Sequence, residues 1–303
     1  MPSIRSFLIR LYIKHSLKKI AGLSFLEARK LRDESGDIFK IAPGVSKVDI
    51  LINTFKAEWL IPDNEISDSA ILYLHGGAYV LGSLRTHRGL ASHIAKAGRT
   101  RVLLIDYRLA PENPYPAALD DALTAYKWIQ ETTGLPTNRI IIAGDSAGGG
   151  LALATAIRLR ESGQALPRAL ICLSPWTDLT FSGTSINSQL KQDPFFSSTD
   201  QLQMAASAYA GEHDLSNPEI SPRLANYQGL PEIFIQVGSD EILLSDSIDL
   251  VSIAQKSGTK ISVDVWPGMW HVWQVFHGVM PESKKAIESI GEKIKFFLDD
   301  SHR

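Results

Sequence analysis

The residues with the clearest chemical potential surround Ser146, where an apolar run changes abruptly into a helix-forming run. In Arg139-Ile-Ile-Ile-Ala-Gly-Asp-Ser-Ala-Gly-Gly-Gly-Leu-Ala-Leu-Ala154, Gly144 and Gly148 lie two positions before and after this serine. A G-x-S-x-G turn between a strand and a helix holds its serine in a strained conformation, and the small residues let the two elements approach closely. A serine that merely caps a helix lacks this context. The pattern therefore predicts that Ser146 is a nucleophile.

A nucleophilic serine also needs preset donors for the oxyanion that forms on the carbonyl oxygen. A strand-like run ends at His75-Gly-Gly-Ala78, whose two glycines leave backbone N–H groups free to approach a ligand. Gly76 and Gly77 are therefore candidate donors, and the N–H of Ala147, the residue after the nucleophile, is the third. His75 precedes the serine. In folds that place a G-x-S-x-G serine between a strand and a helix, the chain order is serine, acid, histidine, so we interpret His75 as structural.

The same chain order points to the last strand-like run for the base and to the run before it for the acid. Of the eight histidines, His271 is the best placed, because it lies in a loop just beyond the last run. The segment after the preceding run offers three carboxylates, those of Asp240, Glu241 and Asp246. Either an Asp or a Glu can orient the imidazole and stabilise its charged form, so the role alone leaves all three open.

Eight β-rich runs that alternate with helix-forming stretches provide the framework for these residues. They are Val48 to Asn53, Ala57 to Ile61, Ala70 to Leu74, Arg101 to Asp106, Arg139 to Ala143, Ala169 to Leu173, Ile233 to Val237 and Ile261 to Val265. The alternation predicts an α/β fold in which helices cover both faces of a mostly parallel sheet, and the first two runs are close enough to form an antiparallel pair. No linker rich in Pro, Gly or Ser divides the chain, so we expect a single domain over residues 1–303.

Two regions depart from the alternation, residues 1 to about 45 and residues from about 180 to 225. Both have mainly helical patterns. Insertions at strand ends commonly build a lid at the carboxyl edge of a sheet, so we interpret the two regions as a helical cap over the site. The alternative is a set of peripheral helices remote from the substrate.

The first twenty residues predict an amphipathic helix. Cations interrupt every apolar stretch before the core of an export signal can form, at Arg10, Lys14, Lys18 and Lys19. Apolar side chains recur at helical spacing at Ile4, Phe7, Leu8, Leu11 and Tyr12, and less clearly at His15. Such a helix can lie on a membrane or on the protein, and we favour packing on the protein because it is the commoner fate. No apolar run reaches the roughly 18 residues of a membrane span, so we expect no stable membrane insertion.

Composition and charge argue against several other classes of function. Lys and Arg total 31 against 33 for Asp and Glu, and no basic run has interleaved aromatics, so we expect no nucleic-acid partner. The single cysteine, Cys172, excludes an intrachain disulfide and a thiolate metal cluster. It lies in an apolar run, which predicts a buried small hydrophobe and fits a reducing, cytoplasmic location.

From about residue 48 to its end, the sequence resembles the bacterial hormone-sensitive-lipase-like esterases, family IV of the lipolytic enzymes, which have the α/β-hydrolase fold. The family's H-G-G motif stands as His75-Gly-Gly77, its G-D-S-A-G-G motif as Gly144–Gly149, and its D-Y-R-L-A-P-E segment as Asp106–Glu112. The family's acid motif, D-P-L, has a leucine two positions after the acid. Glu241-Ile-Leu243 matches that frame, although the family usually has Asp, so Asp240 stays the alternative.

The resemblance implies a carboxylesterase that hydrolyses short- to medium-chain acyl esters through an acyl-enzyme, with no cofactor or metal. The triad it implies is Ser146, Glu241 and His271. The oxyanion hole is expected at Gly76, Gly77 and Ala147, even though Ala78 replaces a third glycine of many members. Asp145 is expected to support the elbow and the loop near His75.

Proteins of the same fold could have other functions. A lactonase, an amidase or a deacetylase would use the same triad. A non-catalytic small-molecule-binding homologue is the alternative from another class, and the intact triad argues against it. The sequence leaves a homodimer open.

Overall fold

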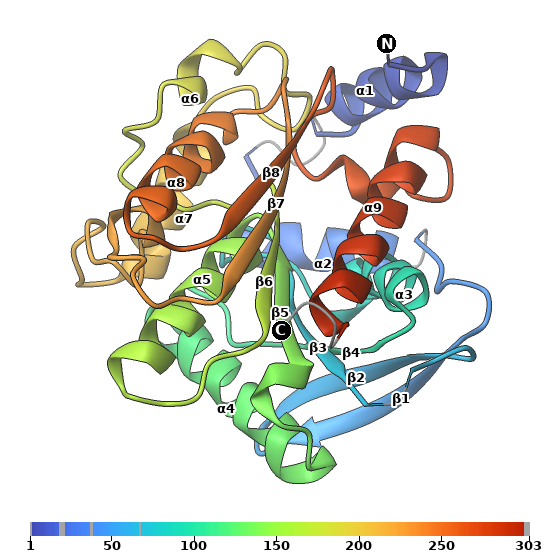
Figure 1. The fold of residues 1–303 in the computed structure, drawn as a ribbon. Coiled ribbons are helices and arrows are strands. Elements are labelled where there is room, and N and C mark those ends of the chain that lie inside the picture. The colour runs from blue at the N-terminus through green and yellow to red at the C-terminus, as the bar shows by residue number, and fades with distance from the viewer. Residues whose placement is uncertain (1, 18–21, 37–38, 67, 300–303) are drawn as a thin grey trace.

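One sheet forms the centre of the molecule in the computed structural model, which describes residues 2–17, 22–36, 39–66 and 68–299. Within these residues eight strands lie in the order β1-β2-β4-β3-β5-β6-β7-β8 (Figure 1). Their bounds are β1 Val45–Ile52, β2 Phe55–Pro62, β3 Ala70–Leu74, β4 Arg101–Ile105, β5 Ile140–Asp145, β6 Ala169–Leu173, β7 Glu232–Gly238 and β8 Ile261–Trp266. β2 is antiparallel to both β1 and β4, and the remaining pairs are parallel.

The strands confirm the pattern predicted from the β-rich runs, including the antiparallel pair formed by the first two. Every residue of β3, β5 and β6 is buried, as expected for central parallel strands covered on both faces. β5 continues to Asp145, two residues further than predicted, because its ladder with β6 extends through Gly144 and Asp145. The central strand therefore runs directly into Ser146.

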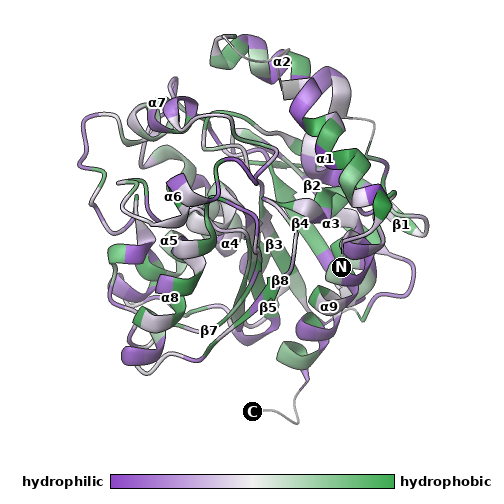
Figure 2. Cartoon of the chain, turned by 90° about the horizontal axis from the view of Figure 1, so that it is seen from above, coloured by the Kyte–Doolittle hydropathy of each residue, from purple (hydrophilic) through white to green (hydrophobic). Residues whose placement is uncertain are grey.

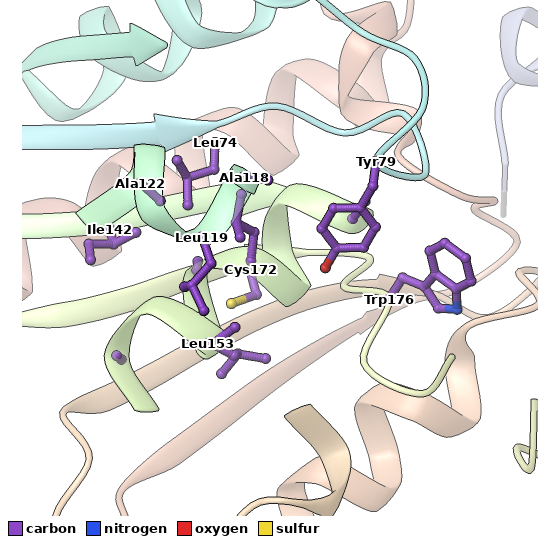
Figure 3. Packing of buried hydrophobic residues seen from close by; sticks show 14 of the residues in the cluster. Leu74, Tyr79, Ala118, Leu119, Ala122, Ile142, Leu153, Cys172 and Trp176 are labelled. Atoms are coloured by element: carbon purple, nitrogen blue, oxygen red, sulfur yellow. The ribbon is translucent and has the colours of Figure 1, made fainter. Parts of the chain in front are cut away.

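Helices cover both faces of this sheet (Figures 1 and 2). α3 and α9 pack on one face, and α4, α5 and α8 pack on the other. Figure 3 shows the second layer, where Leu119 of α4 and Leu153 of α5 lie against Ile142 and Cys172 of the strands. The helix bounds are α1 Ile4–Leu17, α2 Phe25–Ser35, α3 Leu84–Gly98, α4 Ala117–Thr133, α5 Ala147–Glu161, α6 Ser185–Ser188, α7 Asp200–Ala210, α8 Leu244–Lys256 and α9 Pro281–Leu298.

Cys172 is a free, fully buried thiol in this layer, as its apolar surroundings in the sequence predicted. Burial raises the pKa of the thiol to about 12. A thiol held this far from its reactive thiolate form behaves as a small hydrophobe.

The region from residue 180 to 225 is less helical than its pattern predicted. It holds only the short helix α6, the helix α7 and a 3-10 turn, η3 Pro222–Leu224. The side chains of Asp178, Asp193, Asp214 and Asn217 each accept the backbone N–H two residues further on. Such local bonds offer the backbone an alternative to the helix, and they explain why much of the segment is irregular.

The N-terminal helix α1 packs on the protein, but it does not use the apolar stripe that its sequence pattern indicated. Ser6 and Ile13 are buried in the contact, and Ile13 joins a cluster with Met269 and Trp270. The predicted stripe, at Ile4, Phe7, Leu8, Leu11 and Tyr12, is exposed. The expectation that this stripe would pack on the protein is therefore wrong, because α1 is apolar on two sides and docks by the other one. In the part of the chain described, no helix is long and apolar enough to cross a membrane.

Candidate active site

Ser146 occupies a strained elbow between β5 and α5. Its backbone has φ 54° and ψ −122°, a conformation that L-residues rarely adopt. A Cβ atom on Gly148 would lie 1.9 Å from the carbonyl oxygen of Leu74, and one on Gly144 would lie 2.3 Å from the carbonyl oxygen of Gly148. Strand and helix therefore meet backbone to backbone, as the G-x-S-x-G pattern predicted, and the turn carries Ser146 at the carboxyl edge of the sheet.

His271 lies within hydrogen-bond distance of this serine. Its Nε2 atom is 2.9 Å from Ser146 Oγ, and it comes from the loop between β8 and the 3-10 helix η4, Trp273–Phe276. The rings of Phe195 and Phe196 pack near the imidazole, with centroids 6.4 and 5.3 Å from its own. The structure thus brings together two residues that are 125 positions apart in the sequence.

Glu241 lies behind the imidazole and is fully buried. Its Oε1 atom is 3.5 Å from His271 Nδ1, and within the described residues neither atom has another hydrogen-bond partner. The other oxygen, Oε2, accepts the Gly238 N–H and the Ser174 hydroxyl, each at 2.8 Å. The carboxylate therefore faces the imidazole at ion-pair distance while its second oxygen is held in place by two donors.

The two rival carboxylates are held away from the imidazole. Asp240 pairs with Arg10 of α1 at 2.9 Å. Asp246 lies in the first turn of α8, where one of its oxygens accepts the backbone N–H groups of Thr177 and Asp178, each at 3.0 Å. Of the three acids that the sequence offered, the structure places only Glu241 against His271.

The electrostatics of the pair favour a charged imidazolium. Burial by itself lowers the pKa of His271, but Glu241 raises it through its hydrogen-bonding contact and its charge, and the pKa lies above its ordinary value on balance. His271 can therefore accept a proton from the nearby Ser146 hydroxyl when the oxygen of that hydroxyl forms a bond to carbon. The arrangement suits a base that must hold a proton for part of a reaction cycle.

Gly76 does not fit the oxyanion role expected from its sequence position. Its N–H donates to Asp145 Oδ1 at 3.1 Å, so it is already committed within the protein. The space is also filled, since a Cβ atom on Gly76 would lie 2.2 Å from Asp145 Oδ2. The sequence could not reveal this contact because the two residues are 69 positions apart. The expectation for Gly76 therefore needs correction: this residue fastens the loop to the elbow.

Three other backbone N–H groups remain open near the nucleophile, those of Gly77, Ala78 and Ala147. None of them donates to an acceptor within the described residues. Gly77 has φ +124°, and a Cβ atom there would lie 2.2 Å from the carbonyl oxygen of Leu81, which explains the glycine. Ala78, which the sequence pattern did not single out, follows with φ 54°. Two of the three expected donors thus keep a free N–H, and Ala78 adds one.

Asp145 supports the elbow and the neighbouring loop, as its position suggested. Besides the Gly76 N–H it accepts the Tyr73 hydroxyl at 2.8 Å, and its second oxygen lies 3.4 Å from His87 Nε2. Burial alone would raise the pKa of Asp145, but His87 and the Tyr73 hydroxyl outweigh it and hold the pKa below its ordinary value. This carboxylate therefore stays charged and binds the loop without facing the serine.

His75 is packed as a structural residue. It is fully buried and stacks between His87 and Tyr107, with ring centroids at 5.2 and 4.2 Å. Burial, followed by the nearby His87, lowers its pKa to about 3. A histidine that stays neutral and enclosed in this way agrees with the structural interpretation made from the chain order.

Ser174 is a positioning residue that sequence reasoning missed. Its hydroxyl donates to Glu241 Oε2 at 2.8 Å and accepts the Val272 N–H at 3.1 Å. It therefore joins the acid loop to the histidine loop. Its signal in the sequence was its place directly after β6, which puts a polar side chain at the same edge of the sheet as the site.

Asp193 is a second residue that was overlooked, as part of the expected cap. It is buried beside the acid loop, where one oxygen accepts the Phe195 N–H at 3.0 Å and the other accepts the Ile242 N–H at 3.3 Å. Burial raises its pKa to about 7. No sequence pattern distinguishes this aspartate from the others that bind the backbone of the same segment.

Across the described ranges, no group of three or more His, Cys, Asp or Glu side chains is arranged to hold a metal ion.

Comparison with known proteins places these features among ester hydrolases. A family model described as the alpha/beta hydrolase fold matches residues 71–275. An acetyl-hydrolase of Streptomyces hygroscopicus is 43% identical over 235 residues, which make up 78% of each chain. A solved esterase of the bacterial hormone-sensitive lipase family is 37% identical, with a TM-score of 0.92 over 99% of this chain and 100% of that one. The solved esterase EstE5, soaked with p-nitrophenyl butyrate, is 35% identical, with a TM-score of 0.92 over 98% of this chain and 99% of its own.

Proposed function

The chain belongs to the hormone-sensitive-lipase-like esterases of the α/β-hydrolase fold and is a serine carboxylic ester hydrolase, and from this premise we propose that Ser146, Glu241 and His271 form its catalytic triad. The observation that carries the assignment is the 2.9 Å separation of Ser146 Oγ from His271 Nε2, with the opposite ring nitrogen facing Glu241. The partners of Asp240 and Asp246 favour Glu241 over both rivals.

In the first half of the reaction, neutral His271 accepts the proton of the Ser146 hydroxyl while Oγ attacks the carbonyl carbon of the ester. The electron pair of the carbonyl moves to its oxygen. Glu241 keeps the remaining proton on Nδ1 and stabilises the imidazolium. The intermediate then expels the alcohol, which takes its proton from His271, and the acyl group stays on Ser146.

We assign the stabilisation of the oxyanion to the N–H groups of Gly77 and Ala147, with Ala78 as a third donor in place of Gly76. The free state of these groups and their place beside the elbow support the assignment. Donors of this kind act on the transition state, and the loss of one typically costs about 10²- to 10³-fold in rate.

In the second half, His271 takes a proton from water as the water oxygen attacks the acyl carbon. Collapse of that intermediate returns the proton to Ser146 and releases the acid. Each proton that His271 takes it also gives back, so the cycle balances without any further reactant. The groups that move protons in this cycle are side chains of the protein itself.

We propose short- to medium-chain acyl esters as the substrates. The backbone N–H of Trp176 donates to the carbonyl oxygen of Ser146 at 2.9 Å, and its ring packs against that of Phe181. The ring of Trp176 also lies beside that of Tyr79 (Figure 3). Phe196 packs on the other side, against the imidazole. Large rings close to the reacting atoms favour short acyl groups, and the similarity to an acetyl-hydrolase points the same way.

The cap is part of the same proposal. We propose that α1 and the region from 180 to 225 cover the site within a single domain. Arg10 of α1 reaches Asp240 beside the triad acid, and Phe195 and Phe196 pack near His271, which supports the arrangement. We also propose a cytoplasmic location, with which the single buried cysteine agrees. A homodimer stays a prediction.

The test is hydrolysis of p-nitrophenyl esters from acetate to palmitate by the unaltered protein and by Ser146→Ala. Ser188→Ala, in α6, is the matched control because that hydroxyl contacts only its own helix turn among the described residues. We expect the highest activity on acetate to hexanoate, lost only with Ser146→Ala. Activity on p-nitroanilides or lactones that exceeds activity on every ester would favour the amidase or lactonase alternative. No activity on any of them would favour the binding-protein alternative.

A further inference from the structure

Helix α1 presents an apolar face that the protein does not cover. Five large side chains on it are between 50% and 81% exposed, namely Ile4, Phe7, Leu8, Leu11 and Tyr12. Their spacing of three and four residues places them on one side of the helix. A side of four helical turns that exposes five large apolar residues is uncommon on a protein without a partner.

The orientation of this face is fixed by contacts on the opposite side of α1. Ser3, just before the helix, donates its N–H and its hydroxyl to Glu282, at 2.5 and 3.0 Å. Arg10 pairs with Asp240 and also donates to the carbonyl oxygen of Gly268, both at 2.9 Å. Ile13 is buried against Trp270. Because polar and apolar contacts hold α1 along its length, the exposed face is a constant feature of the surface.

The charge around the face is positive. α1 contains no Asp or Glu between Ile4 and Leu17, and its ends carry Arg5 and Lys14. Lys14 donates to the carbonyl oxygen of Lys191, so a second lysine lies beside it. Arg5 donates to the carbonyl oxygen of Val279, a further exposed apolar residue. Two acids beside the helix are engaged from the docked side, Asp240 by Arg10 and Glu282 by Ser3.

We propose that α1 binds the surface of an anionic lipid bilayer. The apolar face enters the boundary between headgroups and acyl chains, and Arg5, Lys14 and Lys191 meet the phosphate groups around it. Helices with an apolar face and a basic border bind membranes in this way, by apolar burial together with attraction to anionic lipid. Lys18 and Lys19, which lie outside the described residues, add to the positive charge of this part of the sequence.

A second copy of the chain is a poorer occupant for the same face. Most dimers are two-fold symmetric, so the same patch would meet itself. The antiparallel pairing of two α1 helices would bring Arg5 of each copy toward Lys14 of the other, with no acid on either helix to compensate. Anionic headgroups carry the charge that the face lacks. Charge complementarity therefore favours lipid.

Membrane binding would set the catalytic site against the lipid. Arg10 connects α1 to Asp240, the neighbour of the proposed triad acid, so α1 lies at the carboxyl edge of the sheet with the site. An esterase adsorbed through α1 would meet esters dissolved in the bilayer. This consequence rests on the proposed function, whereas the lipid contact itself does not.

The first test is flotation of the full chain with vesicles of phosphatidylcholine, either alone or mixed with phosphatidylglycerol. We expect the protein to float with the mixed vesicles and to be released by high salt. The variant Phe7→Ser/Leu8→Ser/Leu11→Ser should bind at least about tenfold more weakly, because the apolar contribution is lost. Ile248→Ser/Val265→Ser/Phe296→Ser is the matched control, since these side chains are also exposed but lie on other elements, and its binding should not change.

A charge variant and the mass in solution complete the test. Arg5→Glu/Lys14→Glu should lose the preference for anionic vesicles, and every variant should keep the hydrolysis of soluble p-nitrophenyl acetate, which separates this proposal from the catalytic one. The proposal is overturned if the unaltered protein does not float with the mixed vesicles, or if the apolar variant floats as well as the control. It is also overturned if light scattering shows a dimer that this variant converts to a monomer, because a second copy would then cover the face.

Discussion

The elbow at Ser146 and the region from residue 180 to 225 hold their residues by opposite means. At the elbow, backbone touches backbone, and Gly148 lies so close to the Leu74 carbonyl that no Cβ atom fits. In the second region, the side chains of Asp193 and Asp214 hold the chain by accepting backbone N–H groups. A backbone contact admits no substitution, whereas one side chain among several can be replaced. We infer that the elbow fixes the reacting atoms and that separate side-chain contacts shape the cap.

The largest effect is expected at the nucleophile. Ser146→Ala removes the proposed nucleophilic oxygen, so kcat/KM for p-nitrophenyl butyrate should fall by about 10⁴- to 10⁶-fold. Ser188→Ala, within the region from 180 to 225, should change it by less than about twofold, because among the described residues its hydroxyl bonds only to the Thr184 carbonyl of its own turn. A loss of kcat/KM in Ser188→Ala as large as that in Ser146→Ala would contradict the inference that the elbow, rather than the region from 180 to 225, fixes the reacting atoms.

The second prediction concerns the backbone contact itself. Gly148→Ala would place a Cβ atom 1.9 Å from the Leu74 carbonyl oxygen and 2.6 Å from that of His75. We expect the free energy of unfolding to fall by about 3 kcal/mol, measured in urea, and esterase activity to fall with it. Gly278→Ala is the control, because nothing lies within 4 Å of its added Cβ atom, and it should be nearly neutral. A Gly148→Ala protein as stable as this control would contradict the close approach.

The acid should show a smaller loss with a characteristic pH dependence. Glu241→Gln removes the charge that stabilises the imidazolium, and kcat/KM should fall by about 10³- to 10⁴-fold. His271 acts as a base only when neutral, so activity is lost as pH falls through its raised pKa. Without Glu241 that pKa drops, and the acid limb of the pH profile of kcat/KM should move to lower pH. Asp240→Asn should leave the limb in place, and a shift with Asp240→Asn alone would reassign the acid.

The smallest effect is expected at Asp193, which links the proposed cap to the acid loop. Asp193→Asn keeps the shape of the side chain and should change kcat/KM by about tenfold or less. Burial raises the pKa of Asp193 to about 7, so the folded state binds a proton that the unfolded chain gives up above about pH 4. This carboxyl therefore lowers stability as pH rises from about 4 to 7. Urea unfolding at pH 5 and pH 8 should show that the variant gains relative to the unaltered protein at the higher pH; an equal difference at both values would contradict this.

The fold and the elbow at Ser146 could be predicted from the sequence because their signals are local. The run from residue 140 to 143 is apolar, Gly144 and Gly148 mark the turn, and Leu-Ala-Leu-Ala154 favours a helix shortly after it. The place of His271 followed from chain order alone. Each of these inferences needed only neighbouring residues or the order of elements. In the structure, Ser146 lies in the elbow and His271 lies beside it.

The acid and the oxyanion donors depended on contacts that no local pattern records. Asp240 and Glu241 are adjacent, and only their contacts in the fold distinguish them: Asp240 pairs with Arg10 of α1, whereas Glu241 faces His271. The N–H of Gly76 is engaged by the carboxylate of Asp145 on another strand, and for this reason we propose Ala78 as a donor in its place. Both outcomes depend on residues brought together from distant parts of the chain.

The docked side of α1 and the backbone course of the proposed cap could not be predicted from the sequence for a related reason. α1 has apolar residues on two sides, and the choice between them is made by Glu282 and by the cluster around Trp270, which belong to the far end of the chain. In the region from 180 to 225, helix-forming residues compete with aspartates that bind the backbone, and the sequence gives no measure of which prevails.

The most direct test of the catalytic account is to trap the acyl-enzyme. The unaltered protein and Ser146→Ala are mixed with p-nitrophenyl butyrate and quenched in acid after milliseconds, and the site of the butyryl group is found by peptide mass spectrometry. We expect a butyryl ester on Ser146 of the unaltered protein and none in the variant. Butyrylation of a different residue, or rapid hydrolysis by Ser146→Ala, would contradict it.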